Sequence, residues 1–450
     1  MSVRNGALSS LSETFAGEIV LPGDADYDSA RAVWNGMIDR RPAIVLRAAN
    51  AADVSTAIGF AREQELTIAV KSGGHSIPGL STCDDGAVID LSRMRGVEVD
   101  PDRRIAQAHG GSLLGELDGQ AQAFGLVCPV GVVGHTGVAG LTLGGGMGRL
   151  QRMFGLTIDN LLSVELVTAD GQLVRASEEE NADLFWGLRG AGSNFGIVTS
   201  FEFRLHPLDG AVTHGTLTHP IDRATELAAI LRETEVAAPD ELWLGFGLGL
   251  TAGDPVAKVQ VLHCGPAEQA ERDLAKLRAF GPPLVDSIET KPHLVAQTMN
   301  DEAMRWGHRF YMKSGFIPSL EDDLIDLLVK HMAHVPDGTD GEVSFWAMGR
   351  AIREVPEDAT AFTGRDAAFW IAAEVLWHDE ALDDQCREWT RTLMDDVRPF
   401  TSVGQYVNDV SEAGQDPASI YGAAKYERLV ALKRAWDPEN IFRLNQNVRP

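Results

Sequence analysis

The six-residue segment Lys71 to Ser76 (KSGGHS) directly follows a strand-like run. It combines two adjacent glycines with a histidine. Because glycine has no Cβ, paired glycines after a strand let backbone N–H groups approach an anion closely. His75 places an imidazole beside them. Taken alone, the hexapeptide fits a tight turn with a surface histidine equally well, so its meaning depends on the rest of the chain.

A second stretch, Gly131 to Gly148 (GVVGHTGVAGLTLGGGMG), is too rich in glycine for the interior of a stable helix or strand. We expect a shaped loop whose backbone amides bind a pyrophosphate or lie against a flat ring system. Val138, Leu141 and Leu143 alternate with the glycines and need burial, which disfavours a flexible linker. The stretch has neither a lysine-bearing phosphate loop nor a GxGxxG fingerprint, so it supports neither a kinase nor a nicotinamide-type dinucleotide site.

Five blocks along the chain resemble the berberine bridge enzyme-like flavoproteins of the vanillyl-alcohol oxidase group. They are KSGGHS, CPVGVVGHTGVAGLTLGGGMGRL, FGLTIDNLLSVELVTADG, LFWGLRGAGSNFGIVTSFEFRLHP and DPENIFRLNQNVRP. The resemblance covers almost the whole chain and is closest to bacterial members. It implies an α+β fold: a two-lobed PCMH-type FAD-binding domain, an α+β substrate domain with an antiparallel sheet, and a C-terminal segment that returns to the flavin.

The resemblance also implies a cofactor site in which His75 is bonded to the 8α-methyl of FAD. Such a bond raises the reduction potential of a flavin and prevents its loss. Asn445 and Asn447, which the resemblance places beside the isoalloxazine, have an alternative role, in which they cap or turn the chain end. The other implied contacts are Lys71, Ser72, Gly73, Gly74, Ser76, Gly79, Leu80 and Ser81 near the pyrophosphate and ribose, Gly137, Gly145 and Gly146 near the flavin, Gly196 and Val198 by the adenine, and Tyr406, Asn408, Asn445 and Asn447 beside the isoalloxazine.

Cys128 precedes Pro129 in a stretch that is similar to the one found in doubly linked members of the family, whose cysteine is bonded to flavin C6. The loop departs from that pattern, because its spacing to His135 is one residue shorter and VAGLTL stands before the triple glycine, as in singly linked bacterial members. A second covalent bond and a free thiol lining the flavin pocket are therefore alternatives. Cys83, Cys264 and Cys386 have no metal-ligand spacing, so we expect no metal site and no disulfide framework.

Oxidation of a substrate by hydride transfer needs a base near flavin N5. Glu354, in GRAIREVPEDATAF, falls where berberine bridge enzyme has its glutamate base, in what resembles a strand of the family. Asp409 falls where cannabinoid-forming members have a tyrosine base, and Tyr406 is a third candidate. We rank Glu354 first, against the general rule that a carboxylate is most often a solvated surface charge.

The elements that must position these residues change along the chain. Short β-branched runs alternate with helical stretches up to about residue 208, and the segment LLSVELVTADGQLVRAS has a turn signal at Ala169-Asp170-Gly171 that predicts antiparallel pairing. Longer helices interleaved with strands follow, which indicates a lobe with its own sheet. We expect an FAD-binding domain over residues 1–208, a substrate-binding domain over 209–400, and a segment that completes the flavin site over 401–450.

Composition and charge limit the kinds of partner that the protein is expected to bind. A net charge of -26 repels phosphate backbones and anionic lipid headgroups, so neither nucleic acid nor a membrane surface is expected as a partner. The chain has no apolar run typical of a secretion signal or a membrane span, which favours a cytoplasmic enzyme. The sequence does not indicate an oligomeric state.

The preferred function is an oxidase that takes a hydride from a C–H beside an alcohol or amine of a small organic substrate, with molecular oxygen as the second substrate and peroxide as product. The alternatives are a flavin dehydrogenase with another electron acceptor and a non-catalytic flavin or small-molecule binding protein. Phe345, Trp346, Phe369 and Trp370 favour a flat or apolar substrate, although a core sheet would use the same residues.

Overall fold

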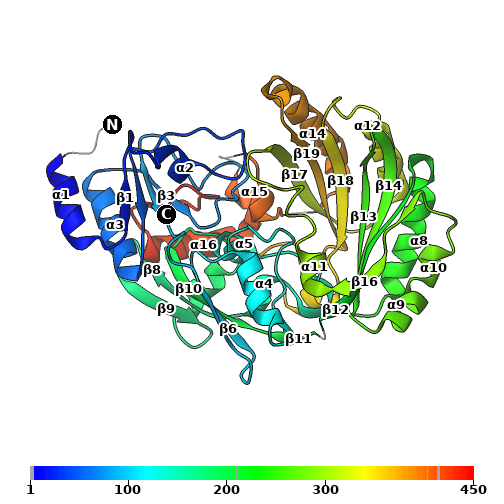
Figure 1. Ribbon diagram of the computed structural model, residues 1–450, viewed down its shortest axis with the longest axis horizontal. Helices are drawn as coiled ribbons and strands as arrows, with labels where there is room; N and C mark the ends of the chain where they lie inside the picture. The colour runs from blue at the N-terminus through cyan, green and yellow to red at the C-terminus, as the bar shows by residue number, and fades with distance from the viewer. Residues whose placement is uncertain (1–4, 209, 403, 413–415) are drawn as a thin grey trace.

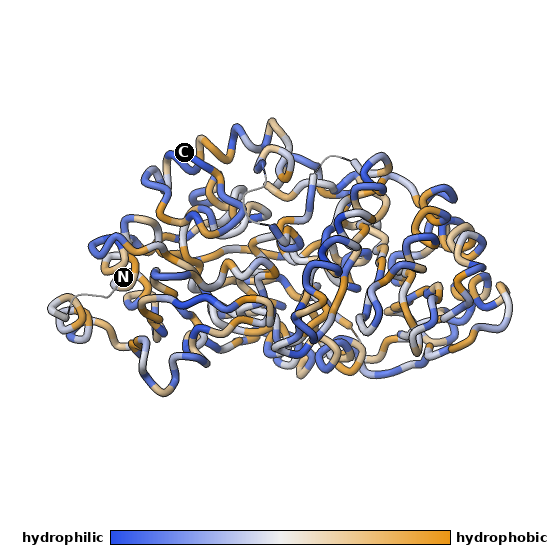
Figure 2. The backbone as a smooth tube through the Cα atoms, turned by 90° about the horizontal axis from the view of Figure 1, so that it is seen from above, coloured by the Kyte–Doolittle hydropathy of each residue, from blue (hydrophilic) through white to orange (hydrophobic). Residues whose placement is uncertain are grey.

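The computed structural model describes residues 5–208, 210–402, 404–412 and 416–450. Two parts lie side by side along the long axis (Figure 1). One part holds the N-terminal residues and the C-terminal segment, and the other holds the residues between them. The view from above shows the same elongated outline, with the helix nearest the N-terminus at one end (Figure 2).

The first lobe is a four-stranded sheet in the order β1-β2-β4-β3, in which β2, β4 and β3 run parallel and β1 pairs antiparallel with β2. Buried Ile, Val and Leu side chains fill its strands, and the helix α3 packs its apolar side on them. The elements are α1 (Asn5–Thr14), β1 (Glu18–Val20), α2 (Tyr27–Arg31), β2 (Ile44–Arg47), α3 (Ala51–Glu63), β3 (Ile68–Lys71) and β4 (Ala87–Asp90).

The second lobe is a five-stranded antiparallel sheet in the order β5-β6-β10-β8-β9. The predicted hairpin is confirmed, because β8 and β9 pair across the Ala169–Gly171 turn. The elements are β5 (Val97–Asp100), β6 (Ile105–His109), α4 (Leu114–Gln122), β7 (Leu126–Val127), α5 (Val138–Gly144), α6 (Gln151–Phe154), η1 (Thr157–Asn160), β8 (Leu161–Val167), β9 (Leu173–Ser177), α7 (Ala182–Leu188), β10 (Ile197–Arg204) and β11 (His206–Pro207).

The third body is a large antiparallel sheet with the path β15-β12-β14-β13-β18-β19-β17, and β16 also pairs with β12. Its strands are β12 (Ala211–Pro220), β13 (Leu242–Thr251), β14 (Asp254–His263), β15 (Val285–Asp286), β16 (Glu289–Pro292), β17 (Arg309–Ile317), β18 (Asp340–Ala347) and β19 (Phe369–Trp377). Its helices are η2 (Ile221–Arg223), α8 (Ala224–Ala237), α9 (Ala267–Asp273), α10 (Ala275–Arg278), α11 (His293–Gln297), α12 (Asp322–Met332), α13 (Arg350–Glu354), η3 (Glu380–Leu382), α14 (Asp383–Val397) and η4 (Arg398–Phe400).

The two faces of this large sheet have different surroundings. Side chains such as Phe345 and Phe369 point to one face and join a core with α8, α10, α12 and α14, which cover that face on the outside of the molecule (Figure 1). Trp346 and Trp370 point to the other face, where they pack with Met147 of the flavin-binding part. The four aromatic residues expected to favour an apolar substrate are therefore split, two in the core and two toward the junction.

The C-terminal segment returns to the first part of the molecule, where it fills gaps beside both lobes (Figure 1). Ile420, Tyr421 and Leu429 join the core of the second lobe, and Phe442 joins that of the first. The segment contains η5 (Val407–Asp409), α15 (Pro417–Tyr421) and α16 (Ala423–Trp436). The expected α+β fold with a returning C-terminal segment is confirmed.

Three local expectations are wrong. The glycine-rich stretch contains the helix α5 instead of being loop throughout, because burial of Val138, Ala139 and Leu143 outweighs the low helix propensity of glycine. One of the longer helices expected after residue 208, in the segment EQAERDLAKLRAFG, is instead two short helices, α9 and α10, which meet at Leu274. Residues 350–354, expected in a strand, form the helix α13.

No helix in the described ranges combines the length and the apolar character that a membrane crossing requires.

Candidate active site

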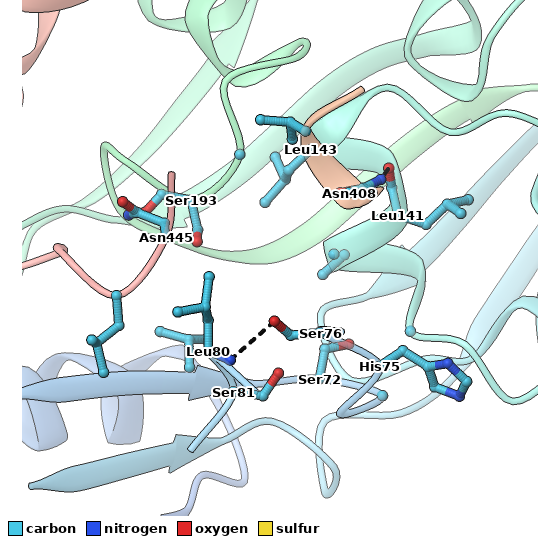
Figure 3. Close-up of a pocket in the computed structure, with 18 of the residues that line it drawn as sticks. Ser72, His75, Ser76, Leu80, Ser81, Leu141, Leu143, Ser193, Asn408 and Asn445 are labelled. Atoms are coloured by element: carbon cyan, nitrogen blue, oxygen red, sulfur yellow. Dashed lines mark hydrogen bonds between the residues drawn. The ribbon is translucent and has the colours of Figure 1, made fainter. Parts of the chain in front are cut away.

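A deep pocket opens between the two lobes of the flavin-binding part and is closed by the C-terminal segment (Figure 3). It contains about 1140 Å³ of space outside protein atoms, including its open mouth. Its walls come from the loop after β3, from α5, from the stretch before β10, and from two C-terminal stretches. The lining includes Ser72, His75, Ser76, Leu80, Ser81, Gly137, Leu141, Leu143, Ser193, Val198, Asn408 and Asn445.

Two glycines bring the walls together at one end. A Cβ on Gly73 would lie 2.2 Å from the backbone N of Gly137, and a Cβ on Gly137 would lie 2.4 Å from the backbone N of Gly73. Any side chain there would push the loop after β3 away from α5. The KSGGHS motif and the glycine-rich stretch therefore meet, and between them they expose backbone to the pocket.

The structure brings most of the predicted cofactor residues into this lining: Ser72, Gly73, Gly74, His75, Ser76, Leu80, Ser81, Gly137, Gly196, Val198, Asn408 and Asn445. It leaves out Lys71, Gly79, Cys128, Gly145, Gly146, Tyr406 and Asn447. Lys71 points away from the pocket, because its ammonium donates to the carbonyl of Ala30 at 2.7 Å and lies 3.5 Å from Asp90. The pyrophosphate contact expected of Lys71 is therefore not available to its side chain.

His75 lies at the lobe junction among aromatic rings. Its ring stacks on Trp34 at 4.9 Å between centroids, and its Nε2 shares a hydrogen bond of 2.7 Å with Nδ1 of His135. Burial, helped by the neighbouring His135, lowers the pKa of His75 to about 3. The imidazole is therefore neutral and keeps a nitrogen lone pair at physiological pH. His135 and Trp34 were not predicted as site residues, although His135 stands within the glycine-rich motif.

Cys128 lies outside the pocket. It is fully buried in the core of the second lobe with Leu114, Leu117 and Ala121. Burial, with the nearby Asp118, raises the pKa of the Cys128 thiol well above its ordinary value. An apolar, protonated thiol is a poor nucleophile, so the arrangement favours the free-thiol alternative, with the thiol in the core and not on the pocket wall.

Asp118, on α4 beside Cys128, offers a stability test that is separate from the site. Its carboxyl group is buried with no hydrogen-bond partner among the described residues, since Gln297 donates to the carbonyl of Gly131 instead. Burial raises the pKa of Asp118 to about 8, and the neighbouring Asp301 adds to the rise. The folded state thus holds a proton that the unfolded state releases near about pH 4.

The stabilising effect of that proton is complete below about pH 4 and is lost as pH rises toward about 8. Asp118→Asn removes this pH dependence. The variant is therefore expected to unfold at a higher temperature than wild type at about pH 9, with a smaller difference at about pH 6. Thermal unfolding at both pH values, with the exposed Asp102→Asn as control, checks this. A difference that shrinks as pH rises would contradict it.

Tyr406 and Asn408 tie the C-terminal segment to the glycine-rich stretch. The Tyr406 hydroxyl accepts from the backbone N of Gly146 at 3.1 Å and of Met147 at 3.3 Å, and from the Asn408 amide at 2.9 Å. Burial raises the pKa of Tyr406 above its ordinary value. A phenol that stays protonated and anchors backbone amides is suited to positioning and not to taking a proton.

Asp409 lies on the side of this segment opposite to the pocket lining. Its neighbours Asn408 and Val410 line the pocket, while its own carboxylate accepts from Nε1 of Trp370 on the large sheet at 2.8 Å. Burial raises the pKa of Asp409 to about 7, although hydrogen bonds from Ser314 and Trp370 lower it in part. A carboxyl group with a pKa near neutrality, between the pocket and the large sheet, is suited to general-base chemistry.

Glu354 does not have the surroundings expected of a base. It ends the helix α13, its side chain is 61% exposed, and its carboxylate pairs with Arg350 on the same helix at 2.7 Å. It neither lines the pocket nor is shielded by aromatic rings. The surroundings expected of a base are thus found at Asp409 and not at Glu354. The segment GRAIREVPEDATAF was expected to place Glu354 on a strand, but residues 350–354 form the five-residue helix α13.

The face of the large sheet that carries Trp346 and Trp370 also carries Glu342 and Glu374, because alternate residues of a strand share a face. Three glycines of β13 lie on this face together with Trp243, and neighbouring side chains cover them. Across β18 and β19, Glu342 pairs in register with Glu374, and Glu342 also lies 3.2 Å from Lys258. Burial, with the charges of Glu342 and Asp409, raises the pKa of Glu374 to about 8.

The pocket fits FAD by the character of its walls. Backbone from Gly73, Gly74 and Gly137 is exposed at one end, where a pyrophosphate or a flat ring can lie close. At another wall, Oδ1 of Asn445 has no partner in the described residues although the amide nitrogen donates to the carbonyl of Ser193. A ligand N–H would satisfy that oxygen.

Comparisons with known proteins agree with this geometry. The FAD binding domain family matches residues 42–177, and the berberine and berberine like family matches residues 406–449. The chain is 31% identical to (R)-6-hydroxynicotine oxidase of Paenarthrobacter nicotinovorans, over 96% of this chain and 97% of that protein. The crystal structure of 6-hydroxy-D-nicotine oxidase from Arthrobacter nicotinovorans superposes with a TM-score of 0.89 at 30% identity, covering 97% of this chain and 98% of that one.

Berberine bridge enzyme from Eschscholzia californica has the same fold, with a TM-score of 0.89 at 22% identity over 99% of each chain. The fold and the glycine-lined pocket define an FAD-linked oxidoreductase. The chain belongs to the berberine bridge enzyme-like family, in the PCMH-type FAD-binding superfamily. The resemblance seen in the sequence is thereby confirmed.

Proposed function

We propose that this enzyme is an oxidase that removes a hydride from a C–H next to an alcohol or amine of a small organic substrate, with Asp409 as the base. The observation that carries this proposal is the position of Asp409. Its carboxylate lies between the segment that lines the cofactor pocket and the large sheet, and its pKa of about 7 lets it accept a proton at physiological pH. Relatives that are named as oxidases support the choice of oxygen as electron acceptor.

FAD, when bound in the pocket, supplies the acceptor for the hydride and passes the electrons on to oxygen, which leaves as hydrogen peroxide. The chain's own residues bind, orient and take the proton. His75 offers a neutral imidazole for a single covalent bond to the cofactor, while Tyr406 and Asn408 hold the segment that carries Asp409. Trp370 fixes the carboxylate of Asp409 through its indole N–H.

The side chains on the sheet face beside Asp409 support a substrate with both an apolar and a polar part. Trp346 and Trp370 give flat apolar surfaces that contact each other at 5.3 Å between ring centroids. Glu342 and Glu374 provide carboxyl groups that can accept hydrogen bonds from substrate hydroxyl or ammonium groups.

The proposed activity is tested by peroxide release from a panel of alcohols, sugars and amines under air, followed by bleaching of the flavin absorbance by the best substrate without oxygen. We expect peroxide to form in proportion to substrate consumed. Bleaching by a substrate, with no recovery of colour when oxygen is admitted, would replace the oxidase by a dehydrogenase.

The single covalent bond has its own test. Because Cys128 is buried in the core and outside the pocket, we expect the flavin to be bonded to His75 alone. Cys128 should then react with an alkylating agent after denaturation, and peptide mass spectrometry should find it free of flavin. A peptide pair joined through one flavin at both His75 and Cys128 would contradict this expectation.

A further inference from the structure

A buried arginine at the junction between the flavin-binding part and the large sheet has no counter-charge. Arg149 directly follows the glycine-rich stretch and is 4% exposed. Its one hydrogen bond runs from Nη1 to the carbonyl of Ala296 at 3.4 Å, and its Nε has no partner. No salt bridge to Arg149 is found in the described ranges. The guanidinium nevertheless stays protonated at physiological pH, because burial lowers its pKa only to about 10.

Two buried histidines flank Arg149. His214 of β12 is 2% exposed and His293 of α11 is 1% exposed. Neither ring nitrogen of His214, nor Nδ1 of His293, has a hydrogen-bond partner in the part of the chain that the structure describes. Burial, helped by the positive charge of Arg149, lowers the pKa of His214 to about 3 and that of His293 to about 4. Both rings are thus neutral and can each donate one N–H.

The charged side chains that lower the pKa of His214 are all basic, while Glu289, in register with His214, is exposed and pairs with Lys291. His214 is influenced by Arg149, by His293 and by Lys291. In a chain with a net charge of -26, a buried cation without a carboxylate beside it is unexpected. A buried charge is costly unless it is paired and hydrogen-bonded, and unpaired buried N–H groups add to that cost.

The indole of Trp243 adds a donor on the same side of the sheet. Trp243 and His214 both pair with Leu262 of β14, from opposite sides, so they lie on one face with Leu262 between them. Nε1 of Trp243 is buried and also lacks a partner among the described residues. The cluster therefore combines one fixed positive charge with several N–H donors, and it contains no negatively charged acceptor among the described residues.

We propose that Arg149, His214 and His293 bind a small inorganic monoanion of the size of chloride. Such an anion accepts hydrogen bonds from all three side chains and neutralises the guanidinium. The unpartnered nitrogens have no contact with solvent, so the bound anion would be enclosed by protein.

The anion would join the two parts of the molecule. The apolar cluster around Arg149 contains Val127, Leu150 and Leu208 from the flavin-binding part and Val212, Trp243 and Leu262 from the large sheet. These residues pack whether or not the anion is bound, but the unneutralised arginine opposes their packing. The site therefore makes the stability of the junction depend on the anion, independently of the proposed reaction.

Two measurements on the flavin-loaded protein test this. Crystals soaked in sodium bromide should show an anomalous peak in contact with the Arg149 guanidinium and the rings of His214 and His293. Thermal unfolding should shift to higher temperature when chloride replaces gluconate at constant ionic strength, because a ligand of the folded state stabilises it by mass action.

Arg149→Met keeps the volume of the side chain and removes its charge, so the variant should lose the difference between chloride and gluconate. Arg398→Met, which changes an exposed arginine that pairs with Asp395, should keep the wild-type difference. Bromide bound only at the surface, or water or a carboxylate against Arg149 in the crystal, would overturn the proposal. So would a chloride effect that is equal in wild type and Arg149→Met. If Arg149→Met does not fold, the bromide map decides alone.

Discussion

Replacement of Asp409 by asparagine should leave a folded, yellow protein whose flavin is reduced by substrate about a hundred to ten thousand times more slowly than in wild type. The asparagine has the same shape and can still accept the hydrogen bond from Trp370, so the segment between Tyr406 and Val410 should keep its place. What is lost is the ability to accept a proton as the hydride leaves the substrate. The effect should appear in the rate of anaerobic flavin reduction and less in the apparent affinity for substrate.

The pH profile gives a signature that a merely structural effect would not produce. In wild type, the reduction rate should rise with pH and level off above about pH 7, because only the ionised Asp409 can act as base and its pKa is about 7. In Asp409→Asn this rise of the reduction rate with pH should be absent.

Glu354→Gln is the matched control, since it makes the same chemical change at a carboxylate that is exposed and paired with Arg350. It should reduce its flavin within about threefold of wild type. A large loss in Glu354→Gln together with a near-normal Asp409→Asn would return the role of base to Glu354.

Replacement of His75 by alanine should abolish the covalent attachment of the flavin. Denatured wild type should give a fluorescent band in a gel, and denatured His75→Ala should give none, because the neutral imidazole is the one nucleophilic side chain that we place at the pocket. The pocket backbone and Asn445 are unchanged in the variant, so it should still bind FAD reversibly and lose it on acid precipitation.

Cys128→Ala serves as the control for His75→Ala and should stay fluorescent. A fluorescent band in His75→Ala that disappears only in the His75→Ala/Cys128→Ala double variant would show that Cys128 also forms a bond. A band that survives even in the double variant would mean that neither residue is the anchor.

The sequence predicted the parts of the fold whose signals are local. The β8–β9 hairpin follows from hydrophobic runs on both sides of a turn signal, and β13, β14 and β19 follow from long apolar strands. The sequence indicated a loop where the structure has the helix α5. The helical state of Val138 to Gly144 comes from burial in the core of the second lobe, a tertiary effect that glycine content does not reveal.

The residues of the candidate site were likewise predicted where their signals are local and missed where they are not. The loop after β3 and the glycine-rich stretch were found because their glycines are required by close backbone contact. The proposed base, Asp409, ranked below Glu354 in the sequence analysis, because the burial of Asp409 depends on Trp370 and Ser314, which lie on distant strands of the large sheet. The pairing of His75 with His135 brings together residues 60 positions apart, and no local pattern reports it.

The central claim, an FAD-linked enzyme with its cofactor bonded to His75, is tested most directly by mass spectrometry of tryptic peptides from the purified wild-type protein. Cleavage after Lys71 and Arg93 gives a peptide of residues 72–93 with His75, and cleavage after Arg104 and Arg149 gives one of residues 105–149 with Cys128. We predict the mass of one flavin on the first peptide, located at His75 by fragmentation, and an unmodified second peptide. A first peptide without flavin, from a protein that is yellow before digestion, would contradict the claim.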